Sequence, residues 1–139
     1  MWGTLGKVAA ATAMTAAVVT LAGAPASAGA TAYNTRSVWL NGLPSAGEAP
    51  ACTSKSIYLA SGTYTWTQLW DGAKYSTREI YLSAGTYTWK DCVVPYDGVY
   101  GQTSSLSRLG LPTAYLPDTN TVGWDRGTYT FGSLLDPHF

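Results

Sequence analysis

Apolar and polar residues alternate along much of the chain beyond residue 55, with the period of two that is typical of β-strands. The alternation is clearest in three segments that share the motif Gly-Thr-Tyr-Thr-aromatic, at residues 56–66, 79–89 and 121–131. In each segment two apolar residues, two positions apart, precede the glycine. The copies are unequally spaced, which argues against a regular solenoid.

Each segment is predicted to form a strand, a tight turn at the glycine and a second strand, as in a β-hairpin. In this register Leu59 faces Tyr64 and Ile57 faces Trp66, so these four side chains share one face of the sheet. We expect that face to form the core. The opposite face carries mainly threonine and is expected to meet water.

Asp-Gly pairs at 71–72 and 97–98 predict two further hairpins. Residues 55–107 are therefore expected to form a meander of about six strands. An opening strand near 36–40 and a closing hairpin at 121–132 raise the total to about eight. In the closing hairpin Trp124 is expected to face Tyr129. The sequence thus predicts an all-β fold, a small antiparallel β-sandwich or barrel with an internal threefold hairpin repeat. Proline-containing stretches at 41–53 and 110–120 are expected to be loops.

Residues 1–28 are expected to be a cleaved signal peptide. Lys7 lies near the start, residues 8–24 are uncharged and mostly apolar, and Ala26 and Ala28 are small residues at the positions that signal peptidase reads. The apolar run is shorter than the ~20 residues needed to span a membrane, which favours cleavage over anchoring. Residues 29–139 are then expected to form a single β domain that is secreted and extracellular.

Cys52 and Cys92 are the two cysteines of the chain. In an oxidising compartment such a pair predicts a disulfide, which stabilises a domain by about 4 kcal/mol for a loop of this length. A metal site or a catalytic thiol is the alternative. The absence of a Cys-x-x-Cys pair and the position of the single histidine, His138, next to the C-terminus favour the disulfide.

Charge and motif content indicate a protein without enzymatic chemistry. The chain carries 8 basic and 8 acidic residues with no basic cluster, which argues against nucleic acid and membrane surfaces as partners. The only glutamates are Glu48 in a proline-containing loop and Glu79 on an expected strand, and the aspartates outside the turns show no clustering, so the paired carboxylates of a glycosidase are not indicated. Metal-ligand spacing and phosphate-binding glycine patterns are missing, so we expect no metal and no cofactor.

The function that the sequence favours is non-enzymatic binding of an extracellular polysaccharide or cell-wall glycan. Sugar rings stack on aromatic side chains, and Tyr58 and Tyr81 fall on the threonine face of the predicted sheet. The full set of candidate binding residues comprises Tyr58, Tyr81, Trp70, Tyr75 and Tyr100. The competing interpretation is that tyrosine simply suits a β-strand.

Two alternatives remain open at this stage. In the first, the protein is an inhibitor of a secreted hydrolase. Small disulfide-linked β domains present rigid loops, and the candidate loops here are residues 42–53 and 108–120. The second alternative is a structural protein of the cell envelope that assembles through exposed strand edges. The partner is accordingly expected to be a glycan or a secreted protein.

Overall fold

The computed structural model describes residues 30–42, 44–117, 119–123 and 125–139. The expected signal peptide at 1–28 and the expected pairing of Trp124 lie outside the described residues. No helix in the described part of the chain is long and apolar enough to cross a membrane.

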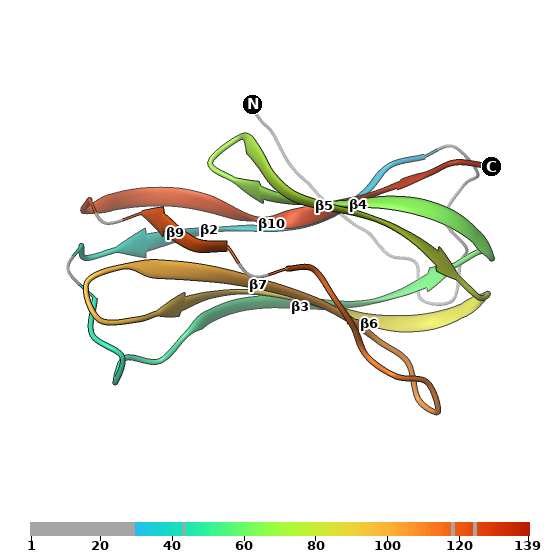
Figure 1. Ribbon diagram of the computed structural model, residues 1–139, viewed down its shortest axis with the longest axis horizontal. Helices are drawn as coiled ribbons and strands as arrows, with labels where there is room; N and C mark the ends of the chain where they lie inside the picture. Colours follow the sequence, from blue (N-terminus) through green and yellow to red (C-terminus); the bar gives the residue numbers. More distant parts are fainter. Residues whose placement is uncertain (1–29, 43, 118, 124) are drawn as a thin grey trace.

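The described residues form an all-β fold of two antiparallel sheets, packed face to face as a sandwich (Figure 1). The predicted all-β class and the predicted antiparallel sandwich are thus confirmed. The first sheet has the order β2 (Ala32–Leu40), β10 (Gly127–Pro137), β4 (Gly62–Trp70) and β5 (Ala73–Leu82). The second contains β3 (Ala51–Leu59), β6 (Gly85–Pro95), β7 (Tyr100–Ser107) and β8 (Ala114–Tyr115), with β9 (Thr119–Gly123) also paired to β7.

The three Gly-Thr-Tyr-Thr segments do not form hairpins, so that prediction is wrong. At Gly62 the chain leaves β3 in the second sheet and enters β4 in the first, and at Gly85 it returns from β5 to β6. The segment at Gly127 likewise joins β9 and β10 in different sheets. A hairpin would place the apolar residues of both strands on one face of one sheet. In the first two segments the crossover places them on two facing sheets. There Leu59, Tyr64, Trp66, Leu82, Tyr87 and Trp89 are buried, and Ile57 and Ile80 are partly buried.

The tyrosine of each motif fastens its crossover. In all three segments the hydroxyl donates a hydrogen bond to the backbone carbonyl four residues upstream, the arrangement known in sandwiches as a tyrosine corner. The bonds are Tyr64 to Ala60 at 2.6 Å, Tyr87 to Ser83 at 2.7 Å and Tyr129 to Asp125 at 2.9 Å. The motif therefore specifies a corner between sheets, and its tyrosine satisfies a carbonyl that the strands leave free.

Both Asp-Gly hairpins are confirmed. Asp71 and Gly72 have φ values of 50° and 88°, as a two-residue type I′ turn requires, and they connect β4 with β5. The second turn joins β6 to β7 and is closed by a 2.9 Å bond from the Tyr96 nitrogen to the Val99 carbonyl. The expected meander is wrong, because the crossovers at Gly62 and Gly85 interrupt it. The loop expected at 41–53 also ends earlier, since β3 begins at Ala51.

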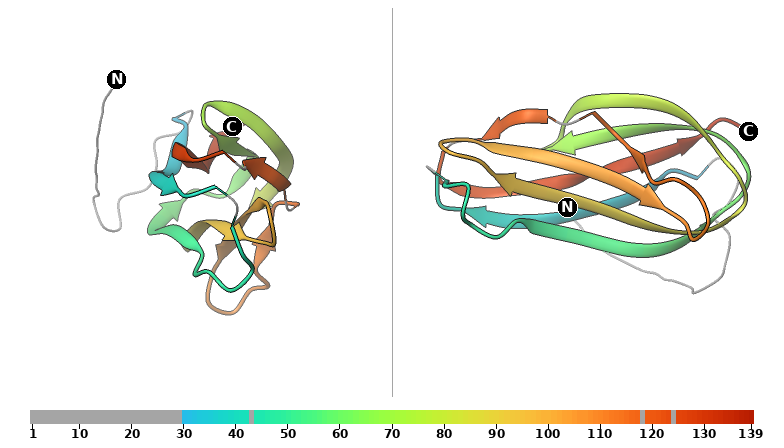
Figure 2. Two further views of the ribbon diagram at one scale, coloured as in Figure 1. Left: turned by 90° about the vertical axis from the view of Figure 1, so that its left-hand side faces the viewer. Right: turned by 60° about the horizontal axis from the view of Figure 1, so that its bottom comes forward.

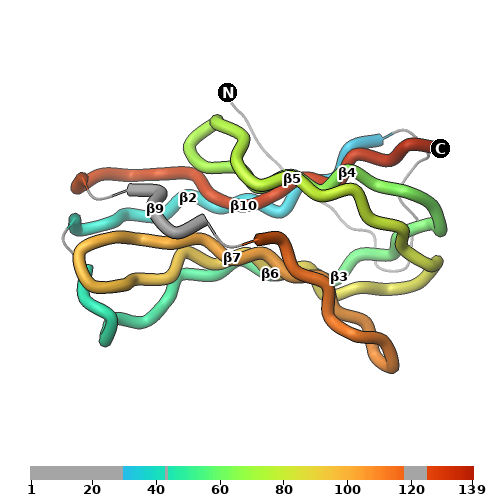
Figure 3. The backbone as a smooth tube through the Cα atoms, in the orientation of Figure 1, coloured from blue at the N-terminus to red at the C-terminus, as the bar shows by residue number. Residues whose placement is uncertain are grey.

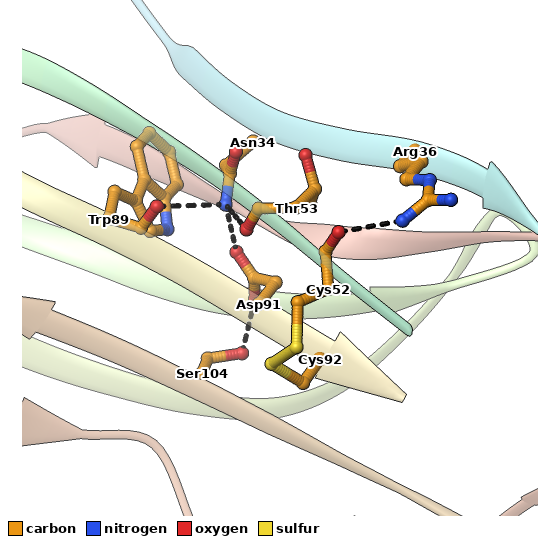
Figure 4. Close-up of a disulfide and its surroundings, with 8 residues drawn as sticks. All are labelled: Asn34, Arg36, Cys52, Thr53, Trp89, Asp91, Cys92 and Ser104. Carbon is orange, nitrogen blue, oxygen red and sulfur yellow. Dashed lines mark hydrogen bonds between the residues drawn. A yellow bond between two sulfur atoms is a disulfide. The ribbon is translucent and has the colours of Figure 1, made fainter. Parts of the chain in front are cut away.

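The predicted disulfide between Cys52 and Cys92 is confirmed. The two residues occupy directly opposite positions of β3 and β6, with Cα atoms 4.1 Å apart (Figure 4). The bond therefore joins neighbouring strands of one sheet. It ties β3, an edge strand, to the interior of its own sheet.

The interior holds two apolar clusters with polar side chains between them. The larger cluster is built on the motif residues and includes Leu59, Tyr64, Trp66, Leu82, Tyr87, Trp89, Leu106, Leu116 and Leu135. The smaller cluster contains Leu40, Trp70, Val93, Tyr100 and Phe131. The predicted core face is thus confirmed in composition, although its members come from both sheets. Figure 2 shows the sandwich along its long axis and in a tilted view, and Figure 3 traces the same chain as a tube.

Candidate functional site

The predicted platform of tyrosines is divided between the two sheets. Tyr58 lies on β3, opposite Thr86, and Tyr81 lies on β5, opposite Thr63. β3 and β5 are edge strands of different sheets, and the strand that packs beside β3 is β2, at the far edge from β5. The two tyrosines therefore lie at opposite edges of the sandwich and do not form a shared ladder.

Two other residues of the predicted platform are core residues. Trp70 and Tyr100 are each 4% exposed and belong to the smaller apolar cluster. Trp70 stacks on Tyr129, with ring centroids 5.0 Å apart. Tyr75 and Tyr81 remain on the surface, 44% and 67% exposed, both on β5. The structure does not bring these five residues together, because alternation predicts which face of a strand a residue occupies, while the crossovers decide which face is outside.

A loop between β7 and β8 projects from the sandwich and carries a fully exposed apolar side chain. This side chain is Leu109, and its neighbour Leu111 is 47% exposed. The loop turns tightly, because the Leu111 nitrogen donates to the Arg108 carbonyl at 3.0 Å and Gly110 has the φ of 88° that a type II turn needs at its third position. The orange loop in Figure 1 extends away from the second sheet at this point.

The base of this loop is held in place by contacts on both sides. Arg108 lies over the ring of Tyr87, 5.7 Å from its centroid, and donates to the Ser83 hydroxyl at 2.9 Å. On the return side Leu116 is buried, and its nitrogen donates to the Ser104 carbonyl at 3.1 Å. We call residues 108–113 the projecting loop. Its tip is apolar and exposed, and its two ends are anchored to the core.

A second feature lies at the end of the sandwich that holds the smaller apolar cluster. It is a depression of about 160 Å³ whose lining includes Trp39, Asn41, Glu48 and Tyr100. Trp39 is 60% exposed. Burial, and secondarily the Glu48 carboxylate, raises the pKa of the Tyr100 phenol, so this group stays neutral and able to donate. Trp39, Asn41 and Glu48 thus line the same depression.

The proline-containing loop that borders this depression is fastened to the turn after β6. The Gly98 nitrogen donates to the Pro44 carbonyl at 2.9 Å, and the Ala46 nitrogen donates to the Asp97 carboxylate at 3.0 Å. The Glu48 carboxylate also accepts a bond from the Ser45 nitrogen at 3.3 Å. These bonds hold Glu48 in its position at the depression.

A buried polar cluster separates the two apolar clusters, with Asp91 at its centre. The Asp91 carboxylate is fully buried and accepts hydrogen bonds from Asn34 at 2.7 Å and from Ser104, as Figure 4 shows. It also accepts one from Ser133 at 2.9 Å. Burial raises the pKa of Asp91 to about 6, against the opposing effect of these donors. The hydrogen-bond partners of Asp91 could not be predicted from the sequence, because they lie on three other strands, β2, β7 and β10.

Ser133 links this polar cluster to two tryptophans. The indole nitrogens of Trp66 and Trp89 both donate to its hydroxyl, at 3.0 and 2.9 Å, while the hydroxyl donates to Asp91. The hydroxyl thereby uses its one donor and both acceptor sites. Gln68, Asp91 and Ser133 each lie six residues after the glycine of their motif, a sequence signal that aligning the motifs further would have revealed.

The exposed side chains of Leu109, Leu111 and Trp39 were also not predicted from the sequence. Leu109 and Leu111 flank a glycine in a proline-containing loop, and that pattern was available as a signal for an exposed apolar tip. Trp39 follows from the alternation of β2, in which Asn34 and Leu40 are buried and Trp39 is exposed. Among the described residues no three metal-ligating side chains gather at one place.

Comparisons with protein-family models, with curated proteins and with solved structures yield no match for this chain.

Proposed function

We propose that this protein is a secreted, non-enzymatic binding domain that engages a secreted protein, in the manner of a hydrolase inhibitor, through the projecting loop. The observation that carries the proposal is the fully exposed Leu109 at the tip of a turn whose ends are anchored. Transfer of a leucine side chain from water into an apolar pocket contributes about 1.5–3 kcal/mol. Because the turn is already ordered, little conformational entropy is lost on binding.

The shape of the loop favours a concave partner. The exposed apolar side chains of the loop are confined to its narrow tip, Leu109 and Leu111, with Tyr115 just beyond. A flat protein surface would need a broader apolar patch to form a stable interface. An enzyme cleft, by contrast, encloses a convex loop and takes one side chain into a specificity pocket. A hydrolase with an apolar specificity pocket is therefore the proposed partner class.

An extracellular location is part of this proposal. The apolar run at the N-terminus and the Cys52–Cys92 disulfide support it, because disulfides persist in oxidising compartments. A secreted hydrolase is present in the same compartment.

The experiment is an inhibition panel of secreted proteases and glycosidases, run with wild type and Leu109→Asp. We expect inhibition of at least one enzyme that accepts leucine or another apolar residue, and we expect Leu109→Asp to weaken it by roughly ten- to a hundredfold. Trp39→Ala, which alters an exposed side chain away from the projecting loop, serves as the matched control and should inhibit like wild type. No inhibition across the panel, or equal inhibition by Leu109→Asp, would contradict the proposal.

Glycan binding remains the second candidate, and the depression at Trp39 is the observation that favours it. An exposed indole can stack on a sugar ring, and the neighbouring Glu48 and Asn41 side chains supply hydrogen-bonding groups. The test is depletion of the protein onto insoluble polysaccharides. Binding that is lost in Trp39→Ala and kept in Tyr81→Ala would support this site, and binding that Trp39→Ala leaves unchanged would exclude it.

A further inference from the structure

One open side of the sandwich is closed by side chains alone. β2 and β3 are edge strands of different sheets that lie beside each other, and no backbone ladder joins them. Three side chains cross between these strands to backbone carbonyls. Asn34 donates to Thr53 at 3.2 Å, Arg36 donates to Cys52 at 2.7 Å, and Lys55 donates to Tyr33.

Within this junction Lys55 and Asn34 both contact Trp89, and Asn34 also contacts Asp91. The Asn34 carboxamide nitrogen lies 2.7 Å from the Asp91 carboxylate and 3.3 Å from the Trp89 carbonyl. The Lys55 amine lies over the Trp89 ring, 5.3 Å from its centroid, and bonds to the Tyr33 carbonyl. Because that carbonyl is part of the peptide bond to Asn34, the amine lies beside the residue that bears the carboxamide.

We propose that Lys55 and Asn34 join in an isopeptide bond, and that Asp91 is the catalytic residue for this reaction. The ammonium of Lys55 first gives a proton to the Asp91 carboxylate. The neutral amine then attacks Cγ of Asn34 and forms the new C–N bond. The Cγ–Nδ2 bond breaks as Asp91 returns the proton to the departing nitrogen. The amine's second proton leaves with the ammonia, which is released as ammonium, and Asp91 ends unchanged.

The surroundings favour the proton transfers. Desolvation lowers the pKa of Lys55, although part of its side chain is exposed, and burial raises the pKa of Asp91 to about 6. The two pKa values therefore approach each other, and proton exchange between the groups becomes less costly. The Asp91 oxygen that would protonate the leaving nitrogen already contacts it. Lysine has a flexible four-carbon stem, which would let the amine move from the Tyr33 carbonyl toward the Asn34 carboxamide.

The bond would have a clear structural consequence. It would covalently link the first sheet to the second at the side where no backbone hydrogen bonds cross. The disulfide already ties β3 to β6 in the second sheet. The two crosslinks together would connect β2, β3 and β6.

Tryptic peptide mapping of the reduced and alkylated wild-type protein tests the proposal directly. Acylated lysine is not cleaved by trypsin, so the bond would produce one species in which the peptide ending at Arg36 is joined to residues 37–74. Its mass would be lower than the sum of the two peptides by one ammonia molecule. Cleavage after Lys55, with the two flanking peptides recovered at their full masses, would overturn the proposal.

Variants of Lys55 and Asp91 assign the roles of these two residues. Lys55→Arg keeps the positive charge and the donors to Tyr33 but lacks a usable nucleophilic amine, so the joined species should disappear. Lys90→Arg, on the same sheet, is the matched control and should retain it. Asp91→Asn should also lose it, and a joined species that persists in Asp91→Asn would overturn the assigned role of Asp91.

A competing loss of ammonia is distinguished by the same map. Asn41 precedes Gly42, a sequence in which asparagine cyclises readily and loses ammonia within its own peptide. That product would appear in residues 37–55 with normal cleavage after Lys55. Ammonia loss found there alone would overturn the proposal.

Discussion

Asn34 on β2 donates a 2.7 Å hydrogen bond to Asp91 on β6, so the edge strand of one sheet is bonded to an interior strand of the other. This contact places a carboxylate in the middle of the sandwich. It explains why the core divides into two apolar clusters rather than one, and it makes several properties of the protein dependent on Asp91.

The first prediction concerns pH. Because the pKa of Asp91 is raised from 3.8 to about 6 in the fold, the native state binds the proton more tightly than the unfolded state. The Asp91 contribution to stability is therefore full below about pH 4 and is lost as pH rises through 6, a difference of about 3 kcal/mol. We expect this trend when the unfolding free energies of wild type and Asp91→Asn are subtracted at each pH. Titration of the wild-type Asp91 carboxyl by NMR with a pKa near 3.8 would contradict it.

The second prediction concerns Ser133. Ser133→Ala leaves two buried indole N–H groups without an acceptor and removes a donor to Asp91. Each buried unsatisfied group costs about 1–3 kcal/mol, so we expect a loss of about 2–5 kcal/mol in urea unfolding. Ser37→Ala, which removes an exposed hydroxyl paired with Thr130, is the control and should change stability by less than about 0.5 kcal/mol. Similar stabilities for the two variants would show that Ser133 is not an obligatory acceptor.

The third prediction concerns Gly132 on β10. A Cβ atom at this position would lie 1.9 Å from the Asn34 carbonyl oxygen and 2.7 Å from the Thr35 Cα, which are backbone atoms that cannot rotate away. Gly132→Ala should therefore disrupt the pairing of β10 with β2 and cost more than about 4 kcal/mol. Thermal unfolding measures the loss, and amide exchange should show early opening of β2. Gly47→Ala has open space around the new atom and should be tolerated.

The fourth prediction concerns the tyrosine corners. Tyr64→Phe and Tyr87→Phe each remove one hydroxyl bond to a crossover carbonyl and leave the ring packing in place. Each should cost about 1 kcal/mol in equilibrium unfolding. Tyr81→Phe, at an exposed position, supplies the baseline and should be neutral. If the corner variants matched Tyr81→Phe, the hydroxyls would have no part in holding the crossovers.

The sequence predicted the strands and the buried face more successfully than the pairing. Leu59 and Tyr64 were correctly placed in the core, because alternation along a strand is a local property. Their strands were wrongly paired, because the same pattern on both sides of a glycine suits a hairpin and a crossover equally. The Asp-Gly turns were predicted correctly, since the backbone that they require is encoded in two adjacent residues.

The buried polar cluster and the surface features depend on contacts that are distant in sequence. Asp91 looked isolated because Asn34 and Ser133 lie more than forty residues away on either side. Tyr100 is unavailable for binding because its side chain packs into the smaller apolar cluster, and the alternation within its own strand does not reveal that burial. Leu109 is exposed because its loop turns at Gly110 while both ends of that loop are anchored, and this geometry is set by residues on other strands.

The central claim is that the projecting loop binds a protein partner. The most direct test is a titration of the hydrolase identified in the inhibition panel with wild type, Leu109→Asp and Trp39→Ala. We predict that Leu109→Asp weakens affinity by roughly ten- to a hundredfold or more, as expected when one buried leucine contact is lost, while Trp39→Ala binds like wild type. Unchanged affinity for Leu109→Asp, or a loss confined to Trp39→Ala, would contradict the claim.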